Sequence, residues 1–364
     1  MLYLSTLTDR IPIIPPFAPD HHISPSAGVV PFGDIFDLKA LSVHLNAPIL
    51  EWRDVKALPE RTIEDAYSTS EVEELGCWTT RKENSPDPTR AYNLVRHLGV
   101  DVSYTRVPMN TRYDPSDRED DHVAFPELAA LVYPRDPILN VGSLTALAPS
   151  EAGHASTPEN QLACFDTLYY ATSGTRRFEW EYTWSPAWRT VGRHLSFTSE
   201  VKDISRSYLA DAFGIGGRVV ADIPPFIAVH IRRGDFRVYC PNNGLIEDPF
   251  PPRSAYKKHV DDIKGTLLAQ RGVRISHILV SSDETAHSFW EGVRQEGWFY
   301  INHTKQGTLE RYGEWYLPVI DVVIQSFACG FVGTHGSTYT LISQKRVEDW
   351  NGGLVKEVDL ASGL

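Results

Sequence analysis

Residues 224–236 read PPFIAVHIRRGDF, and this stretch decides how the chain folds. Two prolines lead into six mostly apolar residues, a pattern typical of a short strand that is buried on both faces of a sheet. His230 lies in that strand, and Arg232 and Arg233 follow at its carboxyl end. Neighbouring strand residues point to opposite sides, so we expect at most one of the two arginines to face a ligand squarely.

The segments around this strand alternate between helical and strand patterns. Residues 198–214 and 254–272 show the apolar spacing of helices, and residues 275–284 contain a second continuous apolar strand. Continuous apolar strands separated by helices predict a parallel sheet that is covered on both faces. The C-terminal half is therefore expected to be Rossmann-like, with a ligand site beyond the carboxyl ends of its strands.

Polar clusters end three of the expected strands: HIRRGD, VSSDE and FVGTHGST. The guanidinium groups of Arg232 and Arg233 can donate paired hydrogen bonds to phosphate, and they stay charged at any working pH. Structural salt bridges, for example to Asp235, explain the arginines equally well when they are taken alone.

The third cluster opens a helix that is predicted to begin at Ser337 or Thr338. Free backbone N–H groups and the positive end of the helix dipole make such a start a phosphate site. Simple capping explains isolated Ser and Thr residues. Because an arginine also ends a strand of the same sheet, a bound diphosphate explains these Ser and Thr residues better than simple capping does.

Carboxylates complete the candidate site. Asp283 and Glu284 could accept hydrogen bonds from a nucleobase or ribose, although Glu284 fits an N-cap of the next helix better. Asp321 lies in an apolar helical stretch, where it requires a structural partner or contacts the ligand. The acidic run at residues 117–121 is interpreted as a solvated loop.

No Asp-x-Asp motif, which is common in manganese-dependent sugar transferases, occurs in the sequence. We expect no metal and no cofactor, with an arginine and a helix end stabilising a leaving diphosphate instead. A net charge of -12 argues against nucleic acid as a partner. No run of about 18 apolar residues predicts a membrane segment, and no signal-like start is recognisable.

The four cysteines, Cys77, Cys164, Cys240 and Cys329, form no C-x-x-C pair, so the sequence gives no support for a zinc site. Their even number permits disulfides, and four buried thiols are equally compatible with a chain of this size.

The N-terminal half also shows an α/β pattern. Strands are predicted within residues 10–17, 47–52 and 101–108, and a helix within 36–45. Residues from about 59 to 125 are rich in Pro, Asp, Arg, Ser and Asn and are interpreted as long surface insertions. The aromatic segment before residue 198 is the expected domain junction, which gives domains at 1–195 and 196–364.

The three C-terminal motifs resemble those of the GDP-fucose-dependent fucosyltransferases, above all the protein O-fucosyltransferases and more distantly the core α1,6-fucosyltransferases. HIRRGDF resembles their H-x-R motif, SSDE their small-small-Asp motif, and DVVIQSFACGFVGTHGSTYT their final nucleotide-binding segment. The order and spacing match over residues 196–350, and the N-terminal half matches only in outline.

This resemblance implies an α/β, GT-B-like enzyme of two facing Rossmann-like domains with parallel sheets. It implies inverting, metal-independent transfer of fucose from GDP-fucose, held by the C-terminal domain, to an acceptor on the N-terminal side. Arg232 matches the arginine that binds the β-phosphate and assists its departure, and Tyr339 replaces a family phenylalanine. The expected substrate-binding residues are His230, Arg233, Asp283, Asp321, Ser337, Thr338 and Tyr339.

The acceptor stays open between a protein Ser/Thr, a glycan and a small molecule. The main alternative is a catalytically inactive nucleotide-sugar-binding protein derived from such a transferase. An enzyme that uses another nucleotide has no G-x-G-x-x-G or G-x-x-x-x-G-K-[ST] motif to support it. The resemblance also implies the lumen of the secretory pathway, in the ER or Golgi, as the location.

Members of this family begin with a strand, a glycine-rich loop and a helix. The opening MLYLSTLTDRIPIIPPF resembles the later part of that helix running into the second strand. We therefore expect the N-terminal domain to lack its first strand and its glycine-rich loop. The alternative is a divergent N-terminus in which another acid, such as Glu51, serves as the base.

Overall fold

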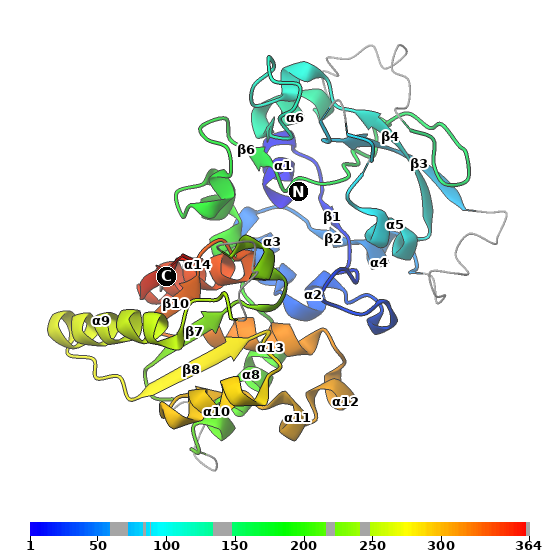
Figure 1. The fold of residues 1–364 in the computed structure, drawn as a ribbon. Coiled ribbons are helices and arrows are strands. Elements are labelled where there is room, and N and C mark those ends of the chain that lie inside the picture. The colour runs from blue at the N-terminus through cyan, green and yellow to red at the C-terminus, as the bar shows by residue number, and fades with distance from the viewer. Residues whose placement is uncertain are drawn as a thin grey trace. The chain divides into compact units, whose positions relative to one another are not determined.

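The computed structural model describes residues 1–58, 72–82, 85–87, 89–133, 148–215, 223–240 and 248–361. The chain divides into two compact units, Met1–Ser196 and Phe197–Leu364 (Figure 1). None of the helices in these described ranges is long and apolar enough to span a membrane.

The described strands of the second unit form a five-stranded parallel sheet, and the apolar runs predict such a parallel sheet. Its strand order is β11-β10-β7-β8-β9. Val229 in the central strand pairs with Val280 on one side and with Val332 on the other. The strands are β7 (Phe226–Ile231), β8 (His277–Ser282), β9 (Phe299–Tyr300), β10 (Gly330–Thr334) and β11 (Leu354–Val358).

Helices cover both faces of this sheet, because alternate strand residues point to opposite sides. Ile227 and Val229 pack with α9 (Arg253–Arg271) and α10 (His287–Gln295). Phe226 and Ala228 pack on the other face with α8, α13 and α14. The bounds of the remaining elements are α8 (Ser199–Ala212), η7 (Gly234–Tyr239), α11 (His303–Gln306), α12 (Thr308–Tyr312), α13 (Tyr316–Gln325) and α14 (Thr338–Asn351).

The connections of this sheet reverse direction between β7 and β10. From β7 the chain builds outward through β8 and β9, and it then returns to add β10 and β11 on the opposite side. Such a reversal leaves a crevice at the carboxyl ends of the two central strands, because the loops that follow them turn to opposite faces. Arg232 follows β7 directly, and His335 follows β10.

In the described part of the first unit, an α/β assembly, the strands form three parallel pairs, β1-β2, β3-β4 and β5-β6. Its elements are α1 (Leu2–Thr8), β1 (Ile13–Ile14), η1 (Pro25–Ala27), α2 (Phe32–Ile35), α3 (Leu38–Leu45), β2 (Leu50–Glu51), α4 (Trp52–Val55), β3 (Glu73–Thr79), α5 (Tyr92–Leu98), β4 (Val100–Arg106), η2 (Met109–Thr111), β5 (Val123–Ala124), α6 (Phe125–Val132), β6 (Ala171–Thr172), η4 (Glu179–Glu181), α7 (Pro186–Thr190) and η5 (Gly192–His194). The expectation that the first domain lacks an N-terminal strand and loop stays a prediction.

The structure confirms the strand predicted within residues 101–108, which is β4, but the interpretation of the rest of residues 59 to 125 as surface insertions is wrong for β3. Residues 59–71 lie outside the described ranges, but β3, α5 and β4 follow and belong to the core. Cys77, Val102 and Tyr104 are buried in one apolar cluster, and Trp78 is buried in another. Polar residues of this stretch are not confined to the surface, because Asp101, Ser103 and Thr105 are buried in β4.

The acidic run at residues 117–121 is likewise not simply a solvated loop. Asp120 is 7% exposed, and its carboxylate accepts hydrogen bonds from the Arg177 guanidinium and the His122 backbone N–H. The Asp121 carboxylate accepts from the Lys82 backbone N–H and pairs with Arg90. These ion pairs tie the acidic segment to the body of the unit.

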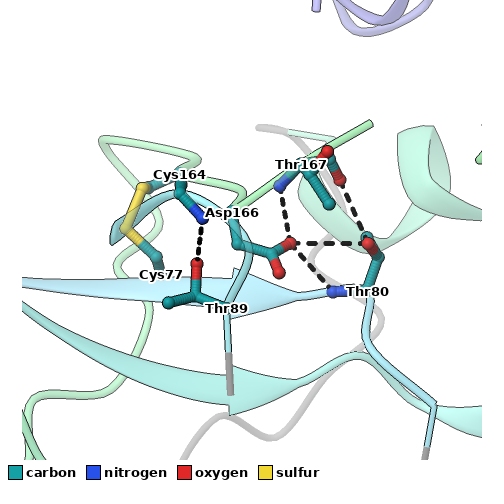
Figure 2. The surroundings of a disulfide bond; sticks show 7 residues. Cys77, Thr80, Thr89, Cys164, Asp166 and Thr167 are labelled. Carbon is teal, nitrogen blue, oxygen red and sulfur yellow. Dashed lines mark hydrogen bonds between the residues drawn. A yellow bond between two sulfur atoms is a disulfide. The ribbon is translucent and has the colours of Figure 1, made fainter. Parts of the chain in front are cut away.

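A disulfide joins Cys77 of β3 to Cys164, and Cys240 and Cys329 are free thiols. Figure 2 shows this disulfide beside Asp166, whose carboxylate accepts the backbone N–H groups of Thr80 at 3.0 Å and Thr167 at 2.6 Å. Burial raises the pKa of Asp166. One covalent bond and one partly buried carboxylate therefore fasten the segment around residue 165 to β3.

Candidate functional site

The expected ligand crevice lies where β7 and β10 end, and Thr334 connects the two strands there. The Arg232 backbone N–H donates to Thr334 Oγ1 over 2.8 Å, and this hydroxyl lies 2.7 Å from the Tyr256 hydroxyl. Tyr256 is fully buried, and burial raises its pKa to about 12. The backbone at the end of β7 is therefore held by neutral, buried hydroxyl groups.

The Arg232 side chain is held between two carboxylates. Its Nη1 donates to Asp283 Oδ2 over 2.6 Å, and its Nη2 donates to Asp235 Oδ1 over 2.5 Å. The Arg232 side chain is 14% exposed, whereas that of Asp235 is 55% exposed. The salt bridge to Asp235 that the sequence left as an alternative is thus present, and it lies in the crevice where a diphosphate site is expected.

Arg233 has carboxylate partners other than those of Arg232. Its guanidinium pairs with Asp248 at 2.8 Å and with Glu284 at 2.7 Å, and it stacks on the ring of Phe250. Burial alone would raise the pKa of Glu284, but hydrogen bonds from backbone N–H groups and the charge of Arg233 lower it. Arg233 therefore ties the residues that follow β7 to Asp248 and Glu284.

Glycine at position 234 is required by the approach of Asp283. A Cβ atom at Gly234 would lie 2.6 Å from Asp283 Oδ2, and the backbone there has a φ of +42°. The Asp283 carboxylate uses its other oxygen to accept the Arg233 backbone N–H over 2.8 Å. Asp283 thus fixes both the side chain of Arg232 and the turn that follows it.

His230 is 4% exposed and points to the opposite side of β7 from Ile231. Its Nδ1 lies 2.8 Å from Thr340 Oγ1, and its ring lies 4.8 Å from that of Tyr339. Burial, with a smaller contribution from the charge of Arg232, lowers the pKa of His230 to about 3. The imidazole is therefore neutral at physiological pH.

The helix start predicted at Ser337 or Thr338 is confirmed. α14 begins at Thr338, and Ser337 caps it by accepting the Thr340 backbone N–H over 3.3 Å. Gly336 before it has a φ of +81°, which a residue with a side chain adopts only with strain. Ser337 is buried and Thr338 is exposed. The Tyr339 hydroxyl donates to the Pro318 carbonyl over 2.7 Å, which ties the helix start to α13.

Asp321 has the structural partner that its apolar surroundings required. Asp321 Oδ1 lies 3.2 Å from His303 Nε2, and His303 Nδ1 lies 3.1 Å from Thr308 Oγ1. The Thr308 hydroxyl donates in turn to the Tyr208 hydroxyl. Asp321 is therefore fixed by a chain of polar groups from α11, α12 and α8.

The structure brings Arg232 and Asp283 into direct contact, and likewise His230 and Tyr339. Sequence reasoning missed Thr334, Tyr256 and Thr340, which hold Arg232 and His230, and His303, which holds Asp321. Thr334 and Thr340 lie inside the motif GTHGSTYT and were open to recognition as polar residues flanking the helix cap. Nothing in the local sequence marks Tyr256 or His303, because their roles depend on tertiary contacts.

Within the described ranges, no three or more His, Cys, Asp or Glu side chains gather in a way that could hold a metal ion. In the first unit, the alternative base Glu51 is already engaged. Its carboxylate accepts the Gly33 backbone N–H over 2.7 Å and pairs with Arg53 over 2.6 Å.

Comparison with solved structures identifies the fold. POFUT1 in its apo form matches with a TM-score of 0.53 at 12% identity, over 98% of this chain and 91% of that chain. POFUT1 in complex with GDP-fucose matches with a TM-score of 0.54 at 11% identity and the same coverage. A second crystal form of that complex matches at 13% identity over 100% of this chain and 92% of that chain, with a TM-score of 0.53. The α/β, GT-B-like fold class with parallel sheets is thereby confirmed.

Comparison with curated protein sequences finds no match. The family model described as GDP-fucose protein O-fucosyltransferase matches residues 1–348. That match spans both units and includes every residue of the candidate site, so the resemblance inferred from the three motifs is confirmed. The chain belongs to the GDP-fucose protein O-fucosyltransferase family.

Proposed function

We propose that this protein is an inverting, metal-independent fucosyltransferase that moves fucose from GDP-fucose to the hydroxyl of a protein Ser/Thr or a glycan. The observation that carries the proposal is the reversal of chain direction between β7 and β10. An arginine ends one of these strands, and the N-terminus of a 14-residue helix follows the other. This arrangement offers a cation and free backbone N–H groups to one diphosphate.

In the proposed reaction, the bond between the fucose anomeric carbon and the β-phosphate oxygen breaks. The acceptor oxygen forms its bond to the opposite face of the same carbon and gives up its proton to a base on the acceptor side. Negative charge grows on the departing diphosphate, so a fixed cation beside it lowers the barrier. Arg232 is the catalytic residue in this proposal, because it is charged throughout and its backbone is held rigidly.

The carboxylates on Arg232 imply how the donor binds. The diphosphate replaces Asp235, whose side chain is 55% exposed, as the partner of the guanidinium. Asp283 stays in place, because it also accepts the Arg233 backbone N–H. The exchange substitutes one anionic partner for another, which allows GDP to leave after the transfer.

The other predicted residues serve binding in this proposal. His230 is neutral and its Nδ1 is engaged by Thr340, so only Nε2 remains for a hydrogen bond to the nucleotide. A proton-donating role for His230 at neutral pH conflicts with its lowered pKa. Asp321, oriented by His303, presents its second carboxylate oxygen as an acceptor for donors on guanine or ribose.

We also propose that the transfer reaction requires no metal ion. The support for this proposal is that arginine and a helix N-terminus together supply the charge stabilisation, while the sequence contains no Asp-x-Asp pair. Calorimetric titration with GDP in excess EDTA tests it. We expect the same affinity with and without the chelator, and strict dependence on added manganese would contradict the mechanism.

The function as a whole is tested by GDP release from GDP-fucose, measured alone and with candidate acceptors of the protein and glycan classes. Faster release with one class, accompanied by fucose transfer to that acceptor, supports a transferase and names its acceptor. GDP-fucose binding without turnover on any acceptor supports the alternative, an inactive nucleotide-sugar-binding protein. Failure to bind either GDP or GDP-fucose contradicts both.

A further inference from the structure

The second unit carries the chain's only sequence pattern for attachment of an N-linked glycan. In Asn302-His303-Thr304, an asparagine is followed two residues later by a threonine, and no proline lies between them. Such a triplet is the acceptor of an N-linked oligosaccharide in proteins that enter the secretory pathway. Three residues also meet this pattern by chance, so the place of the triplet in the fold decides whether the folded protein can carry a glycan.

The triplet lies at the surface, where the chain leaves the edge of the sheet. Strand β9 is the last strand on one side of the sheet, and Asn302 lies between β9 and α11. Asn302 and Thr304 are exposed, whereas Ile301 before them is buried. The asparagine and the threonine that define the pattern are therefore both accessible. A glycan on Asn302 requires no repacking of the core.

The hydrogen bonding of Asn302 leaves the nitrogen that a glycan needs. Its Oδ1 accepts the Lys305 backbone N–H over 2.9 Å and so caps α11. An N-linked glycan is attached to the amide nitrogen, and the amide oxygen keeps its ability to accept a hydrogen bond. Among the described residues, none forms a hydrogen bond with Asn302 Nδ2. The helix cap and the glycan are therefore compatible.

His303, the middle residue of the triplet, has its contacts inside the unit. Its Nε2 lies 3.2 Å from Asp321 Oδ1, and its Nδ1 lies 3.1 Å from the hydroxyl of Thr308, which is fully buried. The inner residue of the triplet thus holds Asp321, while the two outer residues face solvent. A glycan on Asn302 leaves the contact between His303 and Asp321 intact.

A second and independent observation comes from the first unit. The disulfide between Cys77 and Cys164 is a bond that forms and persists in oxidising environments such as the ER lumen and the cell exterior (Figure 2). Disulfides are rare in the cytosol, where thiols are kept reduced. The disulfide and the glycan pattern therefore point to the same pathway, in which N-linked glycans are attached.

We propose that Asn302 is a modification site that carries an N-linked oligosaccharide. In the reaction, Asn302 Nδ2 forms a bond to the anomeric carbon of a lipid-linked oligosaccharide and loses a proton. The bond between that carbon and the diphosphate oxygen breaks, and the lipid diphosphate leaves. The proposal does not depend on the GDP-fucose site or on fucose transfer.

The first test uses the protein isolated from the cells that make it. Trypsin cleavage after Arg294 and Lys305 releases residues 295–305, which contain Asn302 as their only asparagine. Peptide-N-glycosidase in heavy-oxygen water converts a glycosylated asparagine into an aspartate that carries one heavy oxygen atom. We expect this label at position 302. Recovery of the peptide with an unmodified asparagine, without any glycosylated form, would overturn the proposal.

The second test changes the pattern while the fold is kept. The full chain and its variants are delivered into ER microsomes by a cleavable signal peptide, and the glycan is read as a mass shift that the glycosidase removes. We expect the shift in the wild type and in Thr304→Ser, which keeps the hydroxyl, but not in Thr304→Ala. Because Thr304 is exposed, both substitutions should preserve folding by circular dichroism.

A change at the asparagine itself provides the matched control. Asn302→Asp removes the amide nitrogen but keeps an oxygen that caps α11, so it should lose the glycan and still fold. No mass shift in the wild type, or the same shift in Thr304→Ala and Asn302→Asp as in the wild type, contradicts the assignment of the glycan to Asn302.

Discussion

The guanidinium of Arg232 donates to the carboxylate of Asp283 over 2.6 Å, at the point where the sheet of the second unit reverses direction. The same carboxylate also accepts the Arg233 backbone N–H, so it fixes the strand end as well as the arginine. Arg232 is thus rigidly placed before any ligand arrives. A diphosphate that binds there meets an oriented cation but must displace the exposed Asp235.

Arg232→Ala should weaken GDP binding by roughly ten- to a hundredfold, because a charge-assisted hydrogen bond to phosphate contributes about 1.5–3 kcal/mol. The loss should lie near the upper end of this range, since Asp283 and Asp235 would then repel the phosphate without compensation. Arg233→Ala is the matched control and should have a smaller effect, because Arg233 pairs with Asp248 and Glu284. Calorimetric titration of both variants with GDP makes the comparison, and unchanged affinity in Arg232→Ala contradicts the site.

Gly234→Ala should disturb the same site through the backbone. The new methyl group would lie 2.6 Å from Asp283 Oδ2, so the carboxylate must shift and release Arg232. We expect GDP affinity to fall several-fold, and stability to fall by about 1–2 kcal/mol from the left-handed backbone strain. Gly214→Ala is the control, because it has a φ of +69° with nothing within 4 Å. It should lose similar stability in urea and keep its GDP affinity, and equal GDP affinities in the two variants would refute the contact argument.

Protein stability should fall as the pH falls below about 6.5, because His230 is buried in its neutral form. The unfolded chain binds a proton at this histidine below its ordinary pKa of 6.5, whereas the folded protein does so only near pH 3. Between these values the unfolded state binds more protons, so acid favours unfolding by up to about 1.4 kcal/mol per pH unit.

Urea unfolding at about pH 5, 6 and 7 measures this slope. His230→Gln should flatten it, although the variant also loses the contact with Thr340 and starts from lower stability. His21→Gln, at a side chain that is 83% exposed, should keep the wild-type slope. The same slope in His230→Gln as in the wild type would show that another group causes the pH dependence.

The strands of the second unit were predictable because a parallel sheet buried on both faces leaves continuous apolar runs in the sequence. The run FIAVHI became β7, and the helix start at Thr338 followed from ordinary capping chemistry. The reversal of chain direction between β7 and β10 could not be predicted from these local patterns, because strand order depends on which strands pair. The same holds for Tyr256 and His303, whose hydroxyl and imidazole groups reach the site only through the packing of α9 and α11.

In the first unit, β1, β2 and β4 match the predicted strand ranges, but β3 and the buried part of the acidic run were missed because polar composition was taken as a sign of the surface. Asp120 is buried despite its charge, since Arg177 and His122 satisfy its carboxylate. Trp78 is buried in a strand that begins with two glutamates, which point outward at the exposed end of β3.

Removal of the disulfide should destabilise the first unit and leave the second unit intact. The bond closes a loop with a sequence separation of 87, and removing a native disulfide typically lowers the stability of a protein by about 2–5 kcal/mol.

We expect a reducing agent to lower the unfolding temperature of the wild type and to have no further effect on a Cys77→Ala/Cys164→Ala variant. A Cys240→Ala/Cys329→Ala variant, which changes only the free thiols, should keep the wild-type response. GDP affinity should be unchanged in all three proteins, since the residues of the proposed diphosphate site belong to the second unit. Equal unfolding temperatures with and without reductant in the wild type would show that the disulfide contributes nothing to stability, and a parallel loss of GDP affinity would show that the two units are not independent.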